Sequence, residues 1–433
     1  MPRRVSVHFV TLGCPKNEVD SDRMAARVGA SAYEFVPELD AADVAVVNTC
    51  AFIREATEES VVTVLELAAR WKAAAPGRAL VVAGCLATRY GADLAAEMPE
   101  VDAFVPVADE DALLGVIERL TRMPAEASDG PGRTPSGPSA YLQVSDGCFR
   151  RCAYCAIPYI RGGYRSRPFA DLRAEAELLV ASGAKEIVLV GQDISAYGRD
   201  LGDGAPCLPD VVRTLAAVDG LAWLRLMYVQ PDGITPELLE VMAARDNVCH
   251  YLDVPMQHAS RSVLARMNRT GSDDEFLRLL GVVRSFMPDI VLRTSVIAGF
   301  PGETDTDVEL LEDFLLLARF DYAGVFQYSA EEGTPAAVMP GQVLARVKLA
   351  RTQRLRDAAD VVGFERAAAH VGATLEVLCE APAEEEEPHG RWRGQAPEVD
   401  GVVYLDADVA AGTLVRARIV DSAGYDLIGE VVR

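Results

Sequence analysis

Strand-length apolar runs alternate with amphipathic helical stretches along most of this chain, and this alternation constrains its fold more than any other feature. In the first segment, three such runs occupy residues 5–11, 44–49 and 79–83, with helical stretches over 18–28 and 56–75 between them. Alternating strands and helices are typical of an open parallel α/β sheet, because parallel neighbours must be joined by a crossover. We therefore predict an N-terminal α/β domain over residues 1–122.

The same alternation is repeated about six times between residues 139 and 370. The candidate strands are residues 140–145, 186–190, 223–228, 250–254, 290–297 and 323–328, and the helical stretches between them include 169–182, 235–244, 260–267 and 305–318. Six successive βα units predict a partial TIM-like (β/α)6 barrel, in which functional groups lie at the carboxyl ends of the strands.

Changes in composition mark the domain boundaries. Residues 121–140 are rich in Pro and Gly and have no apolar periodicity, which indicates a linker over 123–138. After an Ala- and Arg-rich helical stretch over 344–369, short apolar runs with turn residues predict a small β-barrel of about five strands over 371–433. The acidic run Glu384 to Glu387 within it is interpreted as a solvated loop tip.

The charge of the chain limits the partners that it can bind. Lys and Arg number 42 and Asp and Glu 65 among 433 residues, so the net charge is −23. This balance argues against a protein whose main affinity comes from nucleic-acid phosphates, and it favours a basic protein partner.

No uninterrupted apolar run is long enough for a membrane span, and the N-terminus lacks a secretory apolar region. We expect a cytoplasmic protein, in which the nine cysteines are candidates for metal binding or catalysis rather than for disulfides.

The most specific local motif is a C-x3-C-x2-C cluster, Cys148, Cys152 and Cys155, directly after the first predicted barrel strand. Three thiolates at this spacing can bind an iron–sulfur cluster and leave one iron open to a substrate or cofactor. A structural zinc site normally has a fourth Cys or His nearby, and residues 156–163 supply none. Zinc and inert core cysteines remain the alternatives.

A second set consists of Cys14, Cys50 and Cys85, each of which follows a predicted strand of the first domain. Because the carboxyl ends of parallel strands share one edge, we expect these three thiols to converge. They indicate a second iron–sulfur cluster with an open iron, and the alternatives are a zinc site completed by water or three buried cysteines. The remaining Cys207, Cys249 and Cys379 are interpreted as structural.

The C-x3-C-x2-C loop followed by six βα units resembles the radical S-adenosylmethionine (SAM) superfamily. The resemblance implies a 4Fe–4S cluster whose open iron binds SAM, and a 5′-deoxyadenosyl radical formed when one electron cleaves that cofactor. It also implies SAM-binding residues at the strand ends: Tyr154, Gly191, Gln192, Asp193, Asp253, Gln257, Ala298 and Gly299. His258 lies in one of these loops and is interpreted as a core or supporting histidine rather than as a ligand.

Taken as a whole, the chain resembles the methylthiotransferase family, which combines a three-Cys N-terminal domain, a radical SAM domain and a TRAM domain. This resemblance implies two 4Fe–4S clusters held by the six cysteines and two SAM molecules per turnover. One SAM would methylate sulfur held at the N-terminal cluster, and the other would give the radical that abstracts hydrogen before the C–S bond forms. An electron donor such as a flavodoxin or ferredoxin, and a monomer, are expected.

Members of this family modify either adenosines of transfer RNA or the β-carbon of an aspartate in ribosomal protein uS12. The run G-C-P-K-N at residues 13–17 and the run A-P-E-V-D-G at 396–401 resemble the uS12 group. From residue 371 onward there are five Arg, no Lys and thirteen acidic residues, a charge of −8 that suits a basic ribosomal protein better than RNA. Transfer RNA remains the alternative substrate, and a non-catalytic iron–sulfur protein is the remote one. Phe149, which follows the first cysteine of the C-x3-C-x2-C motif, stands where many family members have Asn. This difference removes none of the three cysteine ligands.

Overall fold

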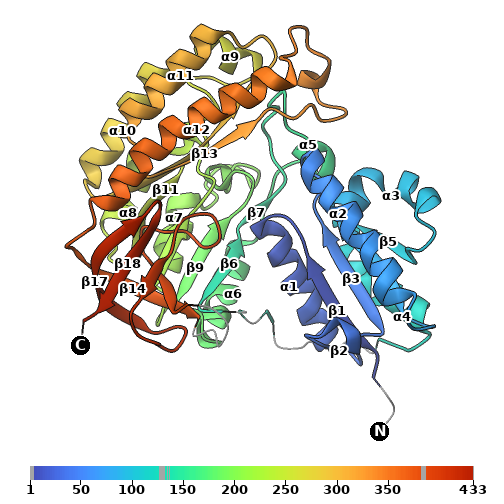
Figure 1. Ribbon diagram of the computed structural model, residues 1–433. Coiled ribbons are helices and arrows are strands. Elements are labelled where there is room, and N and C mark those ends of the chain that lie inside the picture. The colour runs from blue at the N-terminus through green and yellow to red at the C-terminus, as the bar shows by residue number, and fades with distance from the viewer. Residues whose placement is uncertain (1–3, 126–131, 134, 136, 382–386, 433) are drawn as a thin grey trace. The chain divides into compact units, whose positions relative to one another are not determined.

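The computed structural model describes residues 4–125, 132–133, 135, 137–381 and 387–432, and these fold into two compact units (Figure 1). The N-terminal unit contains Met1–Thr134 together with Asp146–Arg150 and Cys155–Arg165. The C-terminal unit contains Pro135–Ser145, Arg151–Tyr154 and Ser166–Arg433. The loop over residues 146–165 carries three cysteines. Two parts of this loop, 146–150 and 155–165, pack in the N-terminal unit. In the sequence, residues 135–145 of the other unit stand between them and the rest of the N-terminal unit.

The N-terminal unit is built on a five-stranded parallel sheet of order β2-β1-β3-β4-β5, so the predicted open parallel sheet is confirmed. Its elements are β1 (Ser6–Thr11), α1 (Pro15–Gly29), β2 (Glu34–Phe35), η1 (Leu39–Ala41), β3 (Val44–Thr49), α2 (Arg54–Leu67), η2 (Ala68–Lys72), β4 (Ala79–Gly84), α3 (Cys85–Glu97), β5 (Ala103–Pro106), η3 (Val107–Ala112), α4 (Leu113–Thr121) and α5 (Ile157–Ile160).

Strands β3 and β4 are buried along their whole length, because helices cover both faces of the sheet. Helices α1 and α4 pack on one face, and α2 and α3 on the other (Figure 1). Two-sided burial explains why these strands are continuous Val- and Ala-rich runs rather than alternating ones. The helix expected over 56–75 is shorter than predicted: α2 ends at Leu67, and the following π-helical turn η2 buries Trp71, whose Nε1 donates to the Leu39 carbonyl at 2.8 Å.

The C-terminal unit contains the predicted partial barrel, a six-stranded parallel sheet of order β13-β12-β11-β10-β9-β6. Its strands are β6 (Ser139–Gln143), β9 (Glu186–Val190), β10 (Trp223–Leu226), β11 (Val248–Asp253), β12 (Val291–Ala298) and β13 (Tyr322–Gln327). The connecting elements are β7 (Ser145–Asp146), β8 (Arg165–Ser166), α6 (Phe169–Ala181), η4 (Ile194–Ala196), α7 (Leu208–Leu215), η5 (Pro231–Gly233), α8 (Pro236–Ala243), α9 (Arg261–Arg266), α10 (Asp273–Phe286), α11 (Asp305–Ala318) and η6 (Pro335–Val338).

The two faces of this sheet differ in chemistry. Leu142, Leu189 and Leu252 belong to the large apolar core that the strands share with the surrounding helices. Alternate positions on the same strands carry Glu186, Arg225 and other charged groups on the opposite face. Burying charge is costly unless each group is paired, so this polar face requires partners from another part of the unit.

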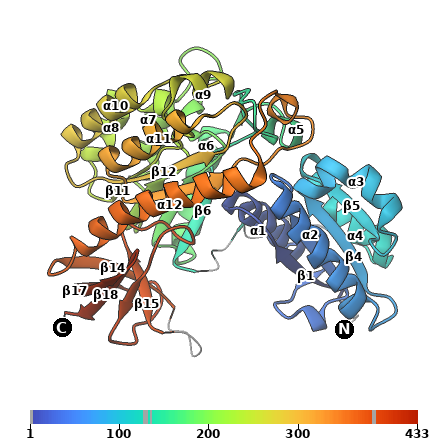
Figure 2. The same cartoon turned by 45° about the horizontal axis from the view of Figure 1, so that its top comes forward.

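Those partners come from the C-terminal barrel. Five strands close it in the order β14-β15-β16-β18-β17, which confirms the predicted small β-barrel. They are β14 (Thr374–Ala381), β15 (His389–Trp392), β16 (Val403–Leu405), β17 (Leu414–Ala423) and β18 (Asp426–Val431). Helix α12 (Ala345–Ala368) lies beside α11 and β13 and leads to this barrel (Figures 1 and 2).

A buried carboxylate between two guanidinium groups joins the barrel to the sheet. Glu186 accepts hydrogen bonds from Arg225 Nε at 2.7 Å and from Arg391 Nη2 at 2.5 Å, and all three side chains are at most 1% exposed. Burial alone would raise the pKa of Glu186, but Arg225 and Arg391 lower it to about 2. Asp400 adds a second link, because it accepts from the Tyr251 hydroxyl at 2.7 Å and lies 3.4 Å from Arg293 Nε.

Two expectations lie partly outside the described residues. These are the linker over 123–138, of which residues 126–131, 134 and 136 are not described, and the acidic run, of which only Glu387 is described and is exposed. Among the residues that the structure does describe, no helix has the length and apolar character needed to span a membrane.

The Glu186 ion pairs lead to a stability prediction. Glu186→Gln removes the buried carboxylate with which Arg225 pairs, and breaking a buried pair by removing one partner typically costs about 3–5 kcal/mol. We expect the unfolding midpoint in denaturant, followed by tryptophan fluorescence, to fall by a corresponding amount. Glu376→Gln is the matched control, because Glu376 is an exposed residue opposite Arg416 and such pairs contribute about 0–1 kcal/mol. Equal midpoints for the two variants would contradict the prediction.

Candidate functional site

Cys14, Cys50 and Cys85 follow the carboxyl ends of neighbouring strands in the N-terminal unit. Cys14 caps α1 after β1, Cys50 follows β3, and Cys85 begins α3 directly after β4. The Asn17 Oδ1 atom is 3.9 Å from the sulfur atoms of both Cys14 and Cys85. Gly13 has a φ of +97°, and a Cβ there would lie 2.5 Å from Cys50 Cβ, so this position requires glycine. The three thiols thus surround one small region; their role as ligands stays a prediction.

Asn17 is the polar centre of this region, and sequence analysis did not single it out as a site residue. Its Nδ2 donates to the carbonyls of Leu12 and Thr49, at 2.8 and 2.9 Å, so the amide is oriented with its oxygen toward the thiols. Asn17 is fully buried, and its own carbonyl accepts from Asn48 Nδ2 at 2.8 Å. It belongs to the G-C-P-K-N run, and that run was the only signal that could have pointed to it.

Two cations act on these thiols. Burial raises the pKa of Cys14, but Lys16 and Arg161, with backbone hydrogen bonds, lower it below the ordinary value. Burial dominates at the other two: it raises the pKa of Cys50, and it raises that of Cys85 to about 12 although Arg161 opposes the shift. The site therefore favours the thiolate form at Cys14, whereas burial favours the protonated form at Cys50 and Cys85.

Arg161 is a buried guanidinium beside the thiols that sequence analysis missed. It pairs with Asp20 at 2.7 Å and with Asp146 at 3.2 Å. Burial and the neighbouring Asp20 raise the pKa of Glu110 to about 9, so this carboxyl group keeps its proton near neutral pH. The C-x3-C-x2-C motif drew attention to the cysteines of this loop, whereas a lone arginine six residues beyond it carries no local signal.

The second cysteine set lies on the loop after β6. Cys148 and Cys155 pack in the N-terminal unit, where the Cys148 amide donates to the Gly162 carbonyl at 3.4 Å and Ala156 and Ile160 share an apolar core with Cys85. Phe149 is 51% exposed, and its ring stacks on that of Tyr164 at 5.0 Å.

Cys152 belongs to the C-terminal unit, where Arg269 Nη1 donates to its sulfur at 3.7 Å and Arg269 Nη2 donates to Gln230 Oε1 at 2.7 Å. Arg269 is another functional candidate without a sequence signal. Within the described part of the chain, no group of three or more His, Cys, Asp or Glu side chains is arranged so that it could hold a metal ion.

Unpaired polar atoms mark the carboxyl ends of β6 and β9. Gly191 follows β9, and a Cβ there would lie 2.8 Å from Ser145 Oγ, so the two backbones approach closely. Ser145 Oγ and both amide atoms of Gln192 are buried without a hydrogen-bond partner among the described residues. Such atoms are costly to bury unless a ligand or water completes them. The predicted contacts Gly191 and Gln192 therefore lie beside buried polar atoms that a ligand or water can complete, and their role in SAM binding stays a prediction.

Two predicted contacts, Asp193 and Asp253, are already engaged. Asp193 accepts from Ser195 Oγ at 2.5 Å. Asp253, at the end of β11, accepts from the Tyr228 amide at 3.0 Å and pairs with Arg293 at 3.0 Å. Tyr228 has a φ of +62°, so Asp253 holds a strained backbone position next to β10.

Backbone contacts hold the other predicted positions. The Gln257 amide donates to Ser295 at 2.8 Å, and the Gly299 amide donates to Glu303 Oε2 at 2.7 Å. Ala298 ends β12 and is buried, and Tyr154 packs against the large apolar core of the C-terminal unit. His258 is fully buried: its Nδ1 accepts from the Ala259 and Ser260 amides, and its Nε2 lies 3.7 Å from Glu303.

The three cysteines interpreted as structural lie apart from these strand ends. The Cys207 thiol caps α7 and donates to Asp210 at 3.2 Å. Cys249 is buried in β11 and Cys379 in β14.

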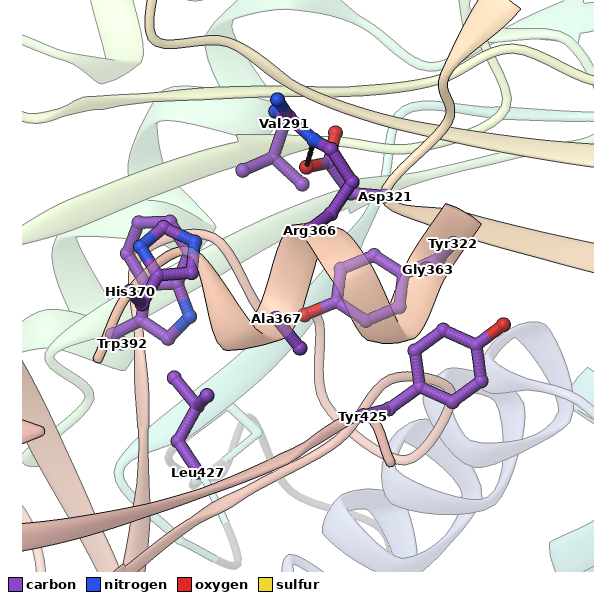
Figure 3. Close-up of a pocket in the computed structure, with 10 residues that line it drawn as sticks. All are labelled: Val291, Asp321, Tyr322, Gly363, Arg366, Ala367, His370, Trp392, Tyr425 and Leu427. Atoms are coloured by element: carbon purple, nitrogen blue, oxygen red, sulfur yellow. Dashed lines mark hydrogen bonds and ion pairs between the residues drawn. The ribbon is translucent and has the colours of Figure 1, made fainter. Parts of the chain in front are cut away.

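A small pocket in the C-terminal unit lies away from the predicted site. It is lined by Val291, Asp321, Tyr322, Gly363, Arg366, Ala367, His370, Trp392, Tyr425 and Leu427. Val291 and Tyr322 begin β12 and β13, so the pocket is at the amino ends of these strands, where α12 meets the barrel. Figure 3 shows Arg366 directed toward Asp321, with which it pairs at 2.7 Å. Because functional groups of such sheets lie at the carboxyl ends, we interpret this pocket as a packing seam.

Comparisons with known proteins identify the three parts of the chain. Residues 6–106 match the model described as "Uncharacterized protein family UPF0004", residues 142–315 match the Radical SAM superfamily, and residues 371–432 match the TRAM domain. A curated protein of Geobacter sulfurreducens named "Ribosomal protein uS12 methylthiotransferase RimO" is 46% identical to this chain, with 98% of each covered. The chain belongs to the RimO family. The predicted family and group are confirmed.

Further RimO relatives have similar identity. Proteins of that name from Citrifermentans bemidjiense and Lachnoclostridium phytofermentans are 44% and 40% identical, each with 98% of this chain covered. Among solved structures, the radical SAM methyltransferase TsrM from Kitasatospora setae has a TM-score of 0.58 at 14% identity, covering 78% of this chain and 74% of that one. At this identity the likeness supports the fold alone, and it agrees with the (β/α)6 architecture.

The raised pKa of Glu110 predicts a pH-dependent stability. Its folded pKa of about 9 exceeds the ordinary 4.5, so between these values the unfolded state has lost a proton that the folded state keeps. Stability contributed by the protonated group therefore falls as pH rises, by at most about 1.4 kcal/mol per pH unit. Glu110→Gln mimics the protonated form, and its thermal midpoint is expected to fall less steeply between pH 6 and about 8.5.

Asp111→Asn is the matched control for this measurement. Its side chain is 84% exposed and it pairs with the half-exposed Arg27, so its slope with pH should equal that of the parent protein. A Glu110→Gln slope identical to that of the control would contradict the assigned protonation state.

Proposed function

We propose that this chain is a radical SAM enzyme that adds a methylthio group to the β-carbon of an aspartate in ribosomal protein uS12. The observation that carries the proposal is the similarity over nearly the whole length to proteins named uS12 methylthiotransferase, together with two three-cysteine sets. We assign the N-terminal domain to residues 1–122, the linker to 123–138, the radical SAM domain to 139–370 and the TRAM domain to 371–433.

We propose that Cys14, Cys50 and Cys85 hold a 4Fe–4S cluster. Thiolates are the usual ligands of such clusters, and three of them leave one iron free to hold sulfur. The fit is supported by the gathering of the thiols around Asn17 and by the two cations Lys16 and Arg161, whose charges offset the negative charge of a thiolate-bound cluster.

We propose that Cys148, Cys152 and Cys155 hold a second 4Fe–4S cluster, to which SAM binds. The unpaired buried atoms of Ser145 and Gln192 support a polar ligand at the ends of β6 and β9, where the amino acid part of SAM would need partners. The proposed SAM-binding residues are Tyr154, Gly191, Gln192, Asp193, Asp253, Gln257, Ala298 and Gly299. Of these, Asp253 would act by holding the strand end, because its carboxylate is already paired with Arg293.

When bound, the two clusters and two SAM molecules would supply the sulfur, the methyl group and the 5′-deoxyadenosyl radical that abstracts hydrogen. The residues of the chain would orient and stabilise these groups. Arg269 donates to the Cys152 sulfur and so fixes its position, and the Asp253 carboxylate fixes the strained Tyr228 backbone beside the SAM loops. A small one-electron carrier such as a flavodoxin or ferredoxin would reduce the second cluster. We also propose a monomer that works in the cytoplasm.

The surface of the C-terminal barrel supports a basic protein substrate over RNA. Two of its described basic side chains are already engaged: Arg391 is buried against Glu186, and Arg393 donates to the Asp246 carbonyl. Arg416 and Arg418 lie directly opposite Glu376 and Glu430 on neighbouring strands, so their charges are balanced. The exposed acidic residues Glu398, Asp406 and Asp408 have no such counterparts opposite them in the described strand pairs. A surface of this charge attracts a basic ribosomal protein and repels phosphates.

The two-cluster assignment predicts the iron content. Protein purified without oxygen should contain about eight irons, and Cys152→Ala should contain about four, with no 5′-deoxyadenosine formed from SAM under reducing conditions. Cys207→Ala is the control and should keep both, because the Cys207 thiol donates to Asp210 at the start of α7, outside both cysteine sets. Full SAM cleavage by Cys152→Ala would refute the assignment of the second cluster.

The substrate can be identified by mass spectrometry of a strain that lacks this gene. We expect uS12 to lose the mass of one methylthio group on an aspartate, with the nucleosides of hydrolysed transfer RNA unchanged. Reintroducing the parent gene should restore the modification, and the Cys152→Ala gene should not. Loss of a methylthio nucleoside with uS12 unchanged would establish transfer RNA as the substrate instead.

A further inference from the structure

Arg161 is the most deeply buried cation of the N-terminal unit that contacts the thiol site. It follows α5 on the segment that also carries Cys155, and its side chain is 2% exposed. Its Nη2 donates to Asn17 Oδ1 at 3.0 Å and to Asp20 Oδ2 at 2.7 Å, and its Nη1 donates to Asp146 Oδ1 at 3.2 Å. A guanidinium presents its donors in a fixed fork, so these contacts set its position.

The contact with Asn17 brings the charge of Arg161 to the thiols. The Asn17 oxygen that accepts from Arg161 also lies 3.9 Å from the sulfur atoms of Cys14 and Cys85. Two backbone carbonyls hold the other end of this amide, so its oxygen cannot turn away from the sulfur atoms. The guanidinium therefore reaches the thiols of Cys14 and Cys85 through one amide oxygen, and it also forms a side-chain hydrogen bond with Cys85.

The groups that face Arg161 determine the effect of removing it. Further cations near this site are Lys16, Arg23 and the exposed Arg165, which lies 3.8 Å from Asp146, and the carboxyl groups include Asp20, Asp146 and Glu110. Asp20 and Asp146 are both paired with Arg161, so a neutral residue in its place leaves two carboxylates beside the thiols without this partner. Losing one positive charge makes the electrostatic potential at the thiols more negative. Leaving two carboxylates without their ion-pair partner changes it in the same direction.

We propose that Arg161 is a positioning residue that holds Asn17 against Cys14 and Cys85 and raises the reduction potential of the cluster at Cys14, Cys50 and Cys85. Reduction adds one negative charge to an iron–sulfur cluster, and a buried cation nearby stabilises the reduced form. This inference rests on the proposed N-terminal cluster. It gives the loop that carries Cys155 a second task, because the same segment supplies a charge to the other cysteine site.

The test uses the full-length chain with the Cys152→Ala change, in which only the N-terminal cluster is expected. Redox titration followed by visible absorption and electron paramagnetic resonance gives its reduction potential. Adding Arg161→Gln should shift the potential to more negative values and alter the resonance of the reduced cluster. Adding Arg165→Gln should do neither. This matched arginine of the same loop is 72% exposed, so solvent and salt screen its charge, and its contact with Asp146 is long, at 3.8 Å.

A second substitution predicts a shift of the opposite sign. Asp20→Asn keeps an oxygen acceptor for Arg161 but removes a negative charge, so the potential should become more positive. If Arg161→Gln fails to retain iron, Asp20→Asn decides the question, and an unchanged potential overturns the inference. Potentials equal to that of Arg165→Gln in both variants also overturn it. Absence of any cluster in the Cys152→Ala protein itself would instead contradict the proposed function.

Discussion

Parallel strands joined by helices end on a common edge, and both cysteine sites depend on this constraint. Three neighbouring strands of the N-terminal sheet bring Cys14, Cys50 and Cys85 around Asn17, although they are far apart in sequence. In the C-terminal unit, the ends of β6 and β9 bring Ser145 beside Gly191 and leave polar atoms of Ser145 and Gln192 unpaired. The same geometric rule thus gathers the proposed site residues on two different sheets.

Both units also bury charged groups, and in each of them buried arginine side chains are paired with carboxylates. In the C-terminal unit, Glu186 is compensated by Arg225 and Arg391, and this group joins the barrel to the polar face of the sheet. In the N-terminal unit, Arg161 is compensated by Asp20 and Asp146. In the first case the ion pairs fix how two substructures pack. In the second they bring a cation next to three thiols, where it helps to lower the pKa of Cys14.

The segment around the A-P-E-V-D-G run has a different role from the one that its acidity suggests. Asp400 is buried between Tyr251 and Arg293, and Arg391 is buried against Glu186. These residues attach the barrel to the sheet and are not available to a substrate. The exposed acidic surface includes Glu398 of this run together with Asp406 and Asp408, which lie beyond it. A group-specific motif can therefore mark an internal contact rather than a recognition surface.

The sequence by itself determined the order of strands and helices, the three-part organisation and both sets of three cysteines. It could do so because apolar periodicity and cysteine spacing are local properties of the chain. Only the tertiary structure revealed Asn17, Arg161, Glu110 and Arg269, since each acts through residues distant in sequence. The ion pair between Asp253 and Arg293 also could not be predicted from the sequence, because it depends on the register of two neighbouring strands. Burial and long-range pairing decide whether a polar residue is free to bind a ligand, and neither is a local property.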